Sequence, residues 1–201
     1  MEKVKWIACI LFLLTAGCTQ TEFTDDFEDG TLHPAYRFSV GSASLVSEEE
    51  GFLIAEGDVE LGLDAIPGKP YPVAPTTIRC PVELGLEVID ASPNEILLLS
   101  LVGSAHVPED FFSVGFFASV PVCADEEEMV SLEGISMPVT LSIACGEDAT
   151  VTGSLEDGSG THPCPLISTL EDVPLSARIH MTGKLVAGYG TVDNFLVRRE
   201  P

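Results

Sequence analysis

The sequence predicts an all-β protein built as a sandwich of two sheets, and three observations support this. Short segments alternate apolar and polar residues with a period of two, which suits strands with one face in a core. Turn-forming residues separate these segments along the chain. The 201 residues include 18 Gly and 14 Pro, too many helix breakers for long helices.

The clearest strand is expected at residues 80–88, where every second residue from Cys80 to Val88 is apolar. The same alternation predicts strands at residues 36–40, 139–143, 150–152 and 177–181. Denser apolar runs at 96–102 and 111–122 predict strands in the middle of the sandwich, where neighbouring elements cover more of the backbone. About ten such strands without a second domain boundary indicate one sandwich domain.

The first 17 residues are expected to be a signal peptide. Lys3 and Lys5 precede an apolar stretch at 6–14 that is too short to cross a bilayer as a helix. Residues 14–18, LTAGC, resemble the lipobox of bacterial lipoproteins, which implies that Cys18 is acylated and anchors the protein. The alternative is an ordinary signal peptide cut nearby.

If Cys18 is the anchor, residues 18–24 form a lipidated tether and residues 25–201 form the sandwich domain. Thr19, in place of Asp, then implies the outer membrane of a bacterial envelope, on its periplasmic or surface face. The formal net charge is −23, with 32 acidic against 9 basic residues, which excludes nucleic acid as a partner. The remaining partners are the membrane, a glycan or an envelope protein.

The order of several segments resembles the concanavalin A-like lectin and glucanase family, which includes the laminin G-like modules. The segments are DDFEDG at 25–30, GFL at 51–53, VTLSI at 139–143 followed by ATVTG at 149–153, and GTVDNFLV at 190–197. The resemblance implies an antiparallel jelly roll of two sheets. It leaves the function open, because enzymes, glycan binders and adhesive modules share that fold.

One carboxylate pattern fits the glucanases of that family, which carry Glu-x-Asp-x-Glu on one face of a strand. Glu56, Asp58 and Glu60 have this spacing. Gly57 replaces an aliphatic residue, the pattern lies early in the chain, and Trp6, the only Trp, leaves with the signal peptide. We therefore expect a non-catalytic binding or structural module, with a carbohydrate-active protein, either lectin-like or a degenerate glucanase, as the alternative.

Tyr71 is the candidate ligand-binding residue, because the Pro-rich loop 67–72 would present its ring at little entropic cost. The alternative is that its ring covers the edge of the sandwich.

The resemblance also implies a structural Ca²⁺ where the first and last strands meet. By motif its ligands are the side chain of Glu28, the carbonyl oxygen of Gly51 and the side chain of Asp193, with Asp26 as an alternative. The competing interpretation is that Asp193 only bonds backbone at the strand edge.

Four cysteines remain for disulfides after the signal peptide and the acylated Cys18 are set aside: Cys80, Cys123, Cys145 and Cys164. If the strands near them run alternately up and down, Cys80 and Cys145 lie at one end and Cys123 and Cys164 at the other. Strands of ten residues are about 33 Å long, beyond disulfide reach. We therefore predict Cys123–Cys164 and Cys80–Cys145, with pairing of sequence neighbours or free buried thiols as alternatives.

Overall fold

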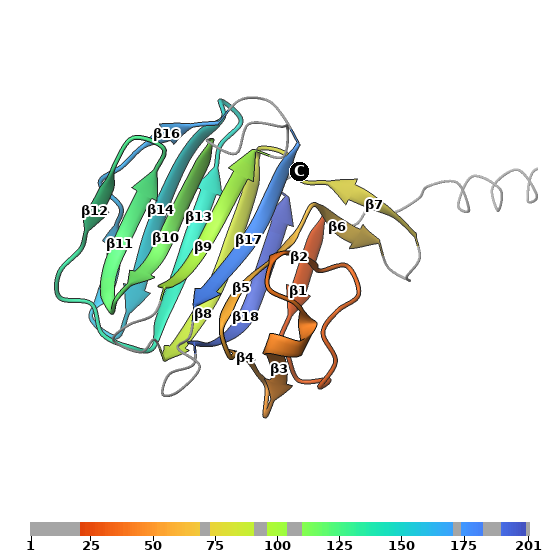
Figure 1. Cartoon of the computed structure of the whole chain (residues 1–201). Helices are drawn as coiled ribbons and strands as arrows, with labels where there is room; N and C mark the ends of the chain where they lie inside the picture. Colours follow the sequence, from red (N-terminus) through yellow and green to blue (C-terminus); the bar gives the residue numbers. More distant parts are fainter. Residues whose placement is uncertain are drawn as a thin grey trace, which may run out of the picture.

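The structure, a computed structural model, consists of two β-sheets packed face to face (Figure 1). It describes residues 21–68, 73–90, 96–103, 110–170, 174–182 and 190–199. The predicted signal peptide, Cys18 and Tyr71 lie outside the described residues. Within the part of the chain that is described, no helix is long and apolar enough to cross a membrane.

Sheet A contains, in spatial order, β15 (Gly160–Pro163), β14 (Thr150–Asp157), β13 (Val139–Cys145), β8 (Val82–Asp90), β18 (Gly190–Arg199), β4 (Phe52–Ala55) and β3 (Val46–Glu49). In the same sheet β1 (Glu22–Asp25) pairs with β18, and β16 (Ser168–Thr169) pairs with β14.

Sheet B contains β12 (Met129–Ser131), β11 (Val120–Asp125), β10 (Phe111–Phe117), β9 (Ile96–Gly103), β17 (Leu175–Thr182), β5 (Asp58–Leu63) and β2 (Arg37–Val40). A separate two-stranded sheet pairs β6 (Ala65–Gly68) with β7 (Val73–Thr77), and a 3₁₀ turn η1 covers Ala43–Leu45. The predicted two-sheet sandwich is confirmed.

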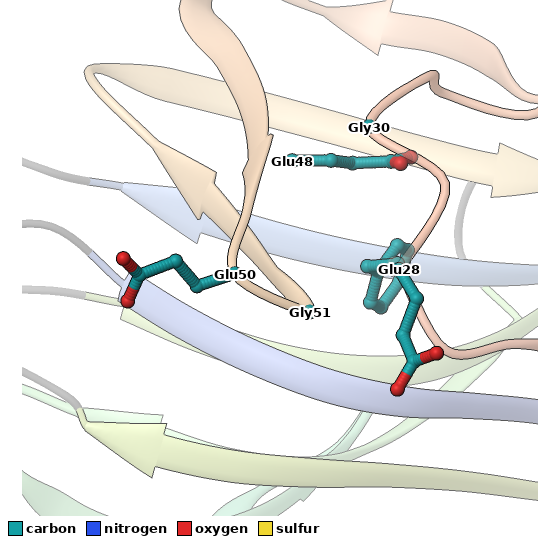
Figure 2. A pocket seen from close by; sticks show the side chains of 6 residues that line it. Glu28, Gly30, Glu48, Glu50 and Gly51 are labelled. Atoms are coloured by element: carbon teal, nitrogen blue, oxygen red, sulfur yellow. The ribbon is translucent and has the colours of Figure 1, made fainter.

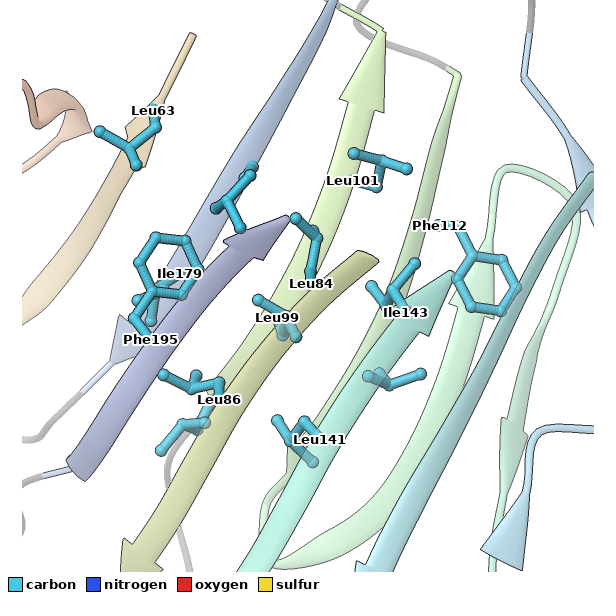
Figure 3. Close-up of a cluster of buried hydrophobic side chains, with 14 of the residues drawn as sticks. Leu63, Leu84, Leu86, Leu99, Leu101, Phe112, Leu141, Ile143, Ile179 and Phe195 are labelled. Carbon is cyan, nitrogen blue, oxygen red and sulfur yellow. The ribbon is translucent and has the colours of Figure 1, made fainter. Parts of the chain in front are cut away.

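The core lies between the sheets and follows the period-two pattern of the sequence. In β8 the residues Val82, Leu84, Leu86 and Val88 are buried, and those between them are partly exposed. Figure 3 shows the two layers of side chains. Sheet A supplies Leu84, Leu86, Leu141, Ile143 and Phe195, and sheet B supplies Leu63, Leu99, Leu101, Phe112 and Ile179, all buried.

Gly153 in β14 sets how closely the sheets approach. A Cβ built there would lie 2.5 Å from Cγ1 of Val114 and 2.8 Å from Cε1 of Phe112, both in β10 of the opposite sheet. The glycine therefore leaves the space that these two side chains fill.

The apolar run at 111–122 is two strands rather than the single strand expected. β10 and β11 form a hairpin, with Ala118 and Ser119 at its turn at φ of 50° and 64°. Neither residue type is a usual turn signal, because positive φ favours Gly, Asn or Asp. The pattern in the sequence therefore hid this turn.

The first strand begins at Glu22, inside the segment predicted as tether. β1 pairs with the last strand, Phe23 opposite Val197. The Phe23 ring is buried and packs edge-on against the rings of His33, Tyr36 and Phe195. Burial of this ring stabilises the pairing of β1 with the sheet. From its composition, the same segment was predicted to be a polar linker.

Both predicted disulfides are present. Cys80 pairs with Cys145, with their Cα atoms 5.3 Å apart, and Cys123 pairs with Cys164, with their Cα atoms 6.0 Å apart. The first joins the start of β8 to the end of β13 within sheet A. The second joins β11 of sheet B to Cys164, whose backbone N–H donates to Gly153 of sheet A, so it links the two sheets.

Candidate functional site

Polar side chains cluster on the outer face of sheet B, the face that points away from the core. In β17 the residues Leu175, Ala177, Ile179 and Met181 are buried, so Ser176, Arg178, His180 and Thr182 point outward. In β5 the residues Val59, Leu61 and Leu63 are buried, which turns Asp58 and Glu60 outward beside them. The outward residues of β5 and β17 thus lie on the same surface, although they are more than a hundred positions apart in the sequence.

Glu60 is the carboxylate with the most partners on this face. Its Oε1 accepts a hydrogen bond of 2.7 Å from a terminal nitrogen of Arg178, and it also accepts one from the Ser39 hydroxyl of β2. Arg178 and Glu60 are both partly buried. An ion pair of this kind holds both side chains in a defined orientation.

Asp58 lies one alternate position earlier on the same face. His180 Nε2 lies 2.9 Å from Asp58 Oδ1, and the Asp58 side chain is 63% exposed. The pair therefore places a carboxylate and an imidazole together on the exposed face of sheet B.

The third acidic residue of the sequence pattern does not join them. Glu56 precedes β5, and Gly57 between Glu56 and Asp58 has φ of 125°, which interrupts the extended backbone. Only Asp58 and Glu60 therefore keep the alternate spacing of a strand.

A small pocket of about 110 Å³ opens next to the Glu60–Arg178 pair. Its lining is Arg37, Phe38, Ser39, Gly62, Asp64 and Arg178. The Asp64 carboxylate in it accepts a hydrogen bond of 2.6 Å from the Ser176 hydroxyl.

On the part of the outer face formed by β9, β10 and β11, a row of apolar side chains continues from Asp58. Register pairs Asp58 with Thr182, Thr182 with Ile96, Ile96 with Phe117 and Phe117 with Val120, which places these residues in one row across five strands. Phe117 and Val120 are each 45% exposed. An exposed ring is a surface on which a sugar can stack. The sequence did not reveal Phe117, because the run 111–122 was interpreted as one covered strand.

The predicted calcium ligands are brought together in part. Glu28 and Gly51 line one pocket of about 260 Å³, together with Phe27, Gly30, Glu48 and Glu50. Figure 2 shows the carboxylates of Glu28, Glu48 and Glu50 pointing in different directions. Among the described residues, no three His, Cys, Asp or Glu side chains are close enough to hold a metal ion.

The third predicted ligand, Asp193, lies in β18 opposite Glu87. Its side chain is outside the described part of the structure. A calcium site at this pocket therefore needs that side chain in addition to Glu28 and Gly51, and Ca²⁺ stays a prediction.

Glu48 is an unexpected member of that pocket. Both of its carboxylate oxygens are buried and lack a hydrogen-bond partner. Burial, together with the nearby negative charge of Asp25, raises the pKa of Glu48 to about 7. Burial likewise raises the pKa of Asp25 and of Tyr36, whose hydroxyl interacts with the Asp25 carboxyl group.

A second cluster, in the β14–β15 hairpin, contains Ser159, His162 and Asp157. The same ring nitrogen, His162 Nε2, lies 3.2 Å from both Ser159 Oγ and Asp157 Oδ1. A catalytic triad needs the two contacts on different ring nitrogens, so this arrangement is not a proton relay. It fixes the turn of the hairpin.

Comparison with known proteins identifies the fold. The structure matches an endo-β-1,3-glucanase from Pyrococcus furiosus with a TM-score of 0.62 at 10% identity, covering 88% of this chain and 93% of that one. It matches a laminarinase catalytic domain from Thermotoga maritima with a TM-score of 0.60 at 11% identity, covering 90% and 98%. A bifunctional GH43-CE protein of Bacteroides eggerthii matches with a TM-score of 0.62 at 17% identity, over 89% of this chain and 26% of that one.

The fold is the concanavalin A-like jelly roll of the glucanases. No family model and no curated protein sequence matches the chain. The predicted jelly roll is thereby confirmed.

The prediction of a non-catalytic protein is contradicted by these neighbours and is corrected, because they include glycoside hydrolases. That prediction discounted the acidic pattern for its early position in the chain. Position in the chain does not determine position in a sheet: β5 sets Asp58 and Glu60 side by side on an outer face, next to β17.

Proposed function

We propose that the protein is carbohydrate-active and that it binds and hydrolyses a glycan along the outer face of sheet B. The observation that carries this proposal is the pair Asp58 and Glu60 on alternate positions of β5. The His180 ring lies beside Asp58, and the Arg178 guanidinium lies beside Glu60. The glucanase jelly roll supports it as a fold that hosts such chemistry.

The spacing of the pair suits glycoside hydrolysis. Alternate residues of a strand lie about 7 Å apart, which is the scale on which glycosidases place their two carboxylates. Glu60, paired with Arg178, is the carboxylate suited to face positive charge on the sugar ring. Asp58, open to solvent beside His180, is the group suited to exchange a proton with the glycosidic oxygen.

The apolar row extends the binding surface beyond the acids. Phe117 lies three strands from Asp58 in the same row, which is about 14 Å at the usual strand spacing. A chain of several sugar rings can span that distance, with its reactive bond near β5 and another ring over Phe117.

The proposal is tested by incubating the purified protein with neutral polymers (laminarin, mixed-linkage β-glucan and xylan) and with anionic ones (sulfated laminarin and polygalacturonate) and measuring reducing ends. We expect hydrolysis of at least one polymer, and a loss of about a hundredfold or more in Asp58→Asn and Glu60→Gln. Glu83→Gln is the matched control, because Glu83 pairs with Arg198 on sheet A, away from this face. Unchanged rates in both site variants, or no hydrolysis of any polymer, would contradict the proposal.

We also propose that Cys18 carries a lipid that holds the protein in a bacterial envelope. The support is the LTAGC segment at residues 14–18. Expression in a bacterial host with labelled palmitate should label the wild type and not Cys18→Ser. Equal labelling of both would refute the anchor.

A further inference from the structure

Two arginines flank a glycine on neighbouring strands of the outer face. Arg37 of β2 and Arg178 of β17 are both register partners of Gly62 in β5. Register partners in adjacent strands point to the same side of a sheet, so both long side chains rise on either side of a position without one. A Cβ at Gly62 would lie 2.7 Å from the Ala177 carbonyl oxygen and 2.9 Å from Cγ of Arg178, so glycine keeps the floor of the pocket open.

The charged groups around this pocket differ in the partners that they have. Arg178 donates to Glu60, and Asp64 accepts from Ser176. Arg37 donates only to the carbonyl oxygens of Pro34 and Tyr36, each at 3.1 Å, and it makes no ion pair within the described part of the chain. A guanidinium has five N–H donors, so Arg37 and Arg178 both keep donors for a further acceptor.

Acidic residues outnumber basic ones 32 to 9 in the sequence, yet Arg37 makes no ion pair with any of the described residues. Its placement opposite a second arginine points to an anionic ligand, since guanidinium groups bind planar or tetrahedral oxyanions through paired hydrogen bonds. The pocket volume of about 110 Å³ suits one small substituent and not a sugar ring. Ser39 also lines the pocket, and its hydroxyl donates to Glu60.

We propose that this pocket binds a carboxylate or sulfate group of the glycan, so that the substrate is an acidic polysaccharide. The inference rests on the proposed function, because it places the charged substituent on the face that carries Asp58 and Glu60. Both substituents present the same chemistry, anionic oxygens directed at Arg37 and Arg178.

The test measures binding of the purified protein to three polymers by affinity electrophoresis and calorimetry, in EDTA. Laminarin is the neutral probe, sulfated laminarin carries sulfate on the same backbone, and polygalacturonate carries carboxylates. We expect at least one anionic polymer to bind about tenfold or more tighter than laminarin. Arg37→Gln should abolish that preference, Arg37→Lys should keep part of it, and added NaCl should weaken it.

Arg198→Gln is the matched control, because it removes one arginine from the opposite sheet, where Arg198 pairs with Glu83. An equal loss of preference in this control would overturn the inference, since the preference would then follow net charge alone. Equal affinity of the wild type for laminarin and both anionic polymers would also overturn it while leaving the proposed function intact. Absence of binding to all three polymers would contradict the proposed function itself.

Discussion

Single residues decide local stability in the β14–β15 hairpin, and Asp157 is the clearest case. Its side chain is fully buried, and its two oxygens accept hydrogen bonds from backbone and hydroxyl donors of Ser136 and Ser159. The Ser159 hydroxyl, with the backbone N–H groups of Ser136 and Ser159, lowers the pKa of Asp157 well below its ordinary value. Asp157 thus ties the 132–138 segment to the hairpin.

Asp157→Asn is expected to lower the urea midpoint at pH 7, because an amide nitrogen would face donors. A lowered folded-state pKa contributes stability that is present above the unfolded value and is lost as pH falls below about 4. The wild type should therefore lose more stability than Asp157→Asn between pH 5 and pH 3. Glu156→Gln, on the exposed face of the same strand, is the control. Identical pH profiles for wild type and Asp157→Asn would refute this role.

At the scale of elements, the first and last strands depend on each other. Among the described strands, β1 pairs with β18 alone, and the turn between β3 and β4 carries Gly51 beside Glu28. The Cγ of Glu28 lies 3.7 Å from the position of a Cβ on Gly51. A cation shared by these segments would stabilise the folded state alone, since the unfolded chain does not hold its ligands together.

Calcium is therefore expected to raise the melting temperature of the purified protein above its value in EDTA. A free concentration a hundredfold above the dissociation constant adds about 2.7 kcal/mol. Glu28→Gln and Asp193→Asn should each remove the shift, whereas Glu147→Gln, in an exposed turn elsewhere in sheet A, should retain it. Identical melting temperatures in calcium and EDTA would exclude the site.

The accuracy of each strand prediction depended on how the strand is buried. The strands at 80–88 and 96–102 were placed to within two residues, because β8 alternates strictly and β9 is a dense apolar run. The turn at Ala118 and Ser119 was missed, since neither residue signals positive φ. Both disulfides were predicted correctly although the strand assumed at 111–122 is a hairpin.

At the scale of the whole molecule, the site depends on strand register, which a single sequence does not encode locally. Asp58 and Glu60 were visible as a spacing, but their partners His180 and Arg178 lie 122 and 118 residues further on. Arg37 is likewise far from Arg178 in the sequence. The two residues lie near each other because both are register partners of Gly62 in β5, the strand between theirs. Pairing across a jelly roll joins distant segments, so the sequence predicted the acids and not their surroundings.

Cys123–Cys164 is the covalent link between the two sheets, and its removal is expected to weaken the whole fold. The two residues are 41 positions apart, and loop-closure entropy for that length corresponds to about 4 kcal/mol. The double variant Cys123→Ala, Cys164→Ala should lose stability of that order in urea unfolding. Cys80→Ala, Cys145→Ala, which closes a loop of 65 residues within sheet A, should lose a similar amount. A loss below about 1 kcal/mol in the first variant would show that packing of Phe112 and Val114 against Gly153 holds the sheets together without the bond.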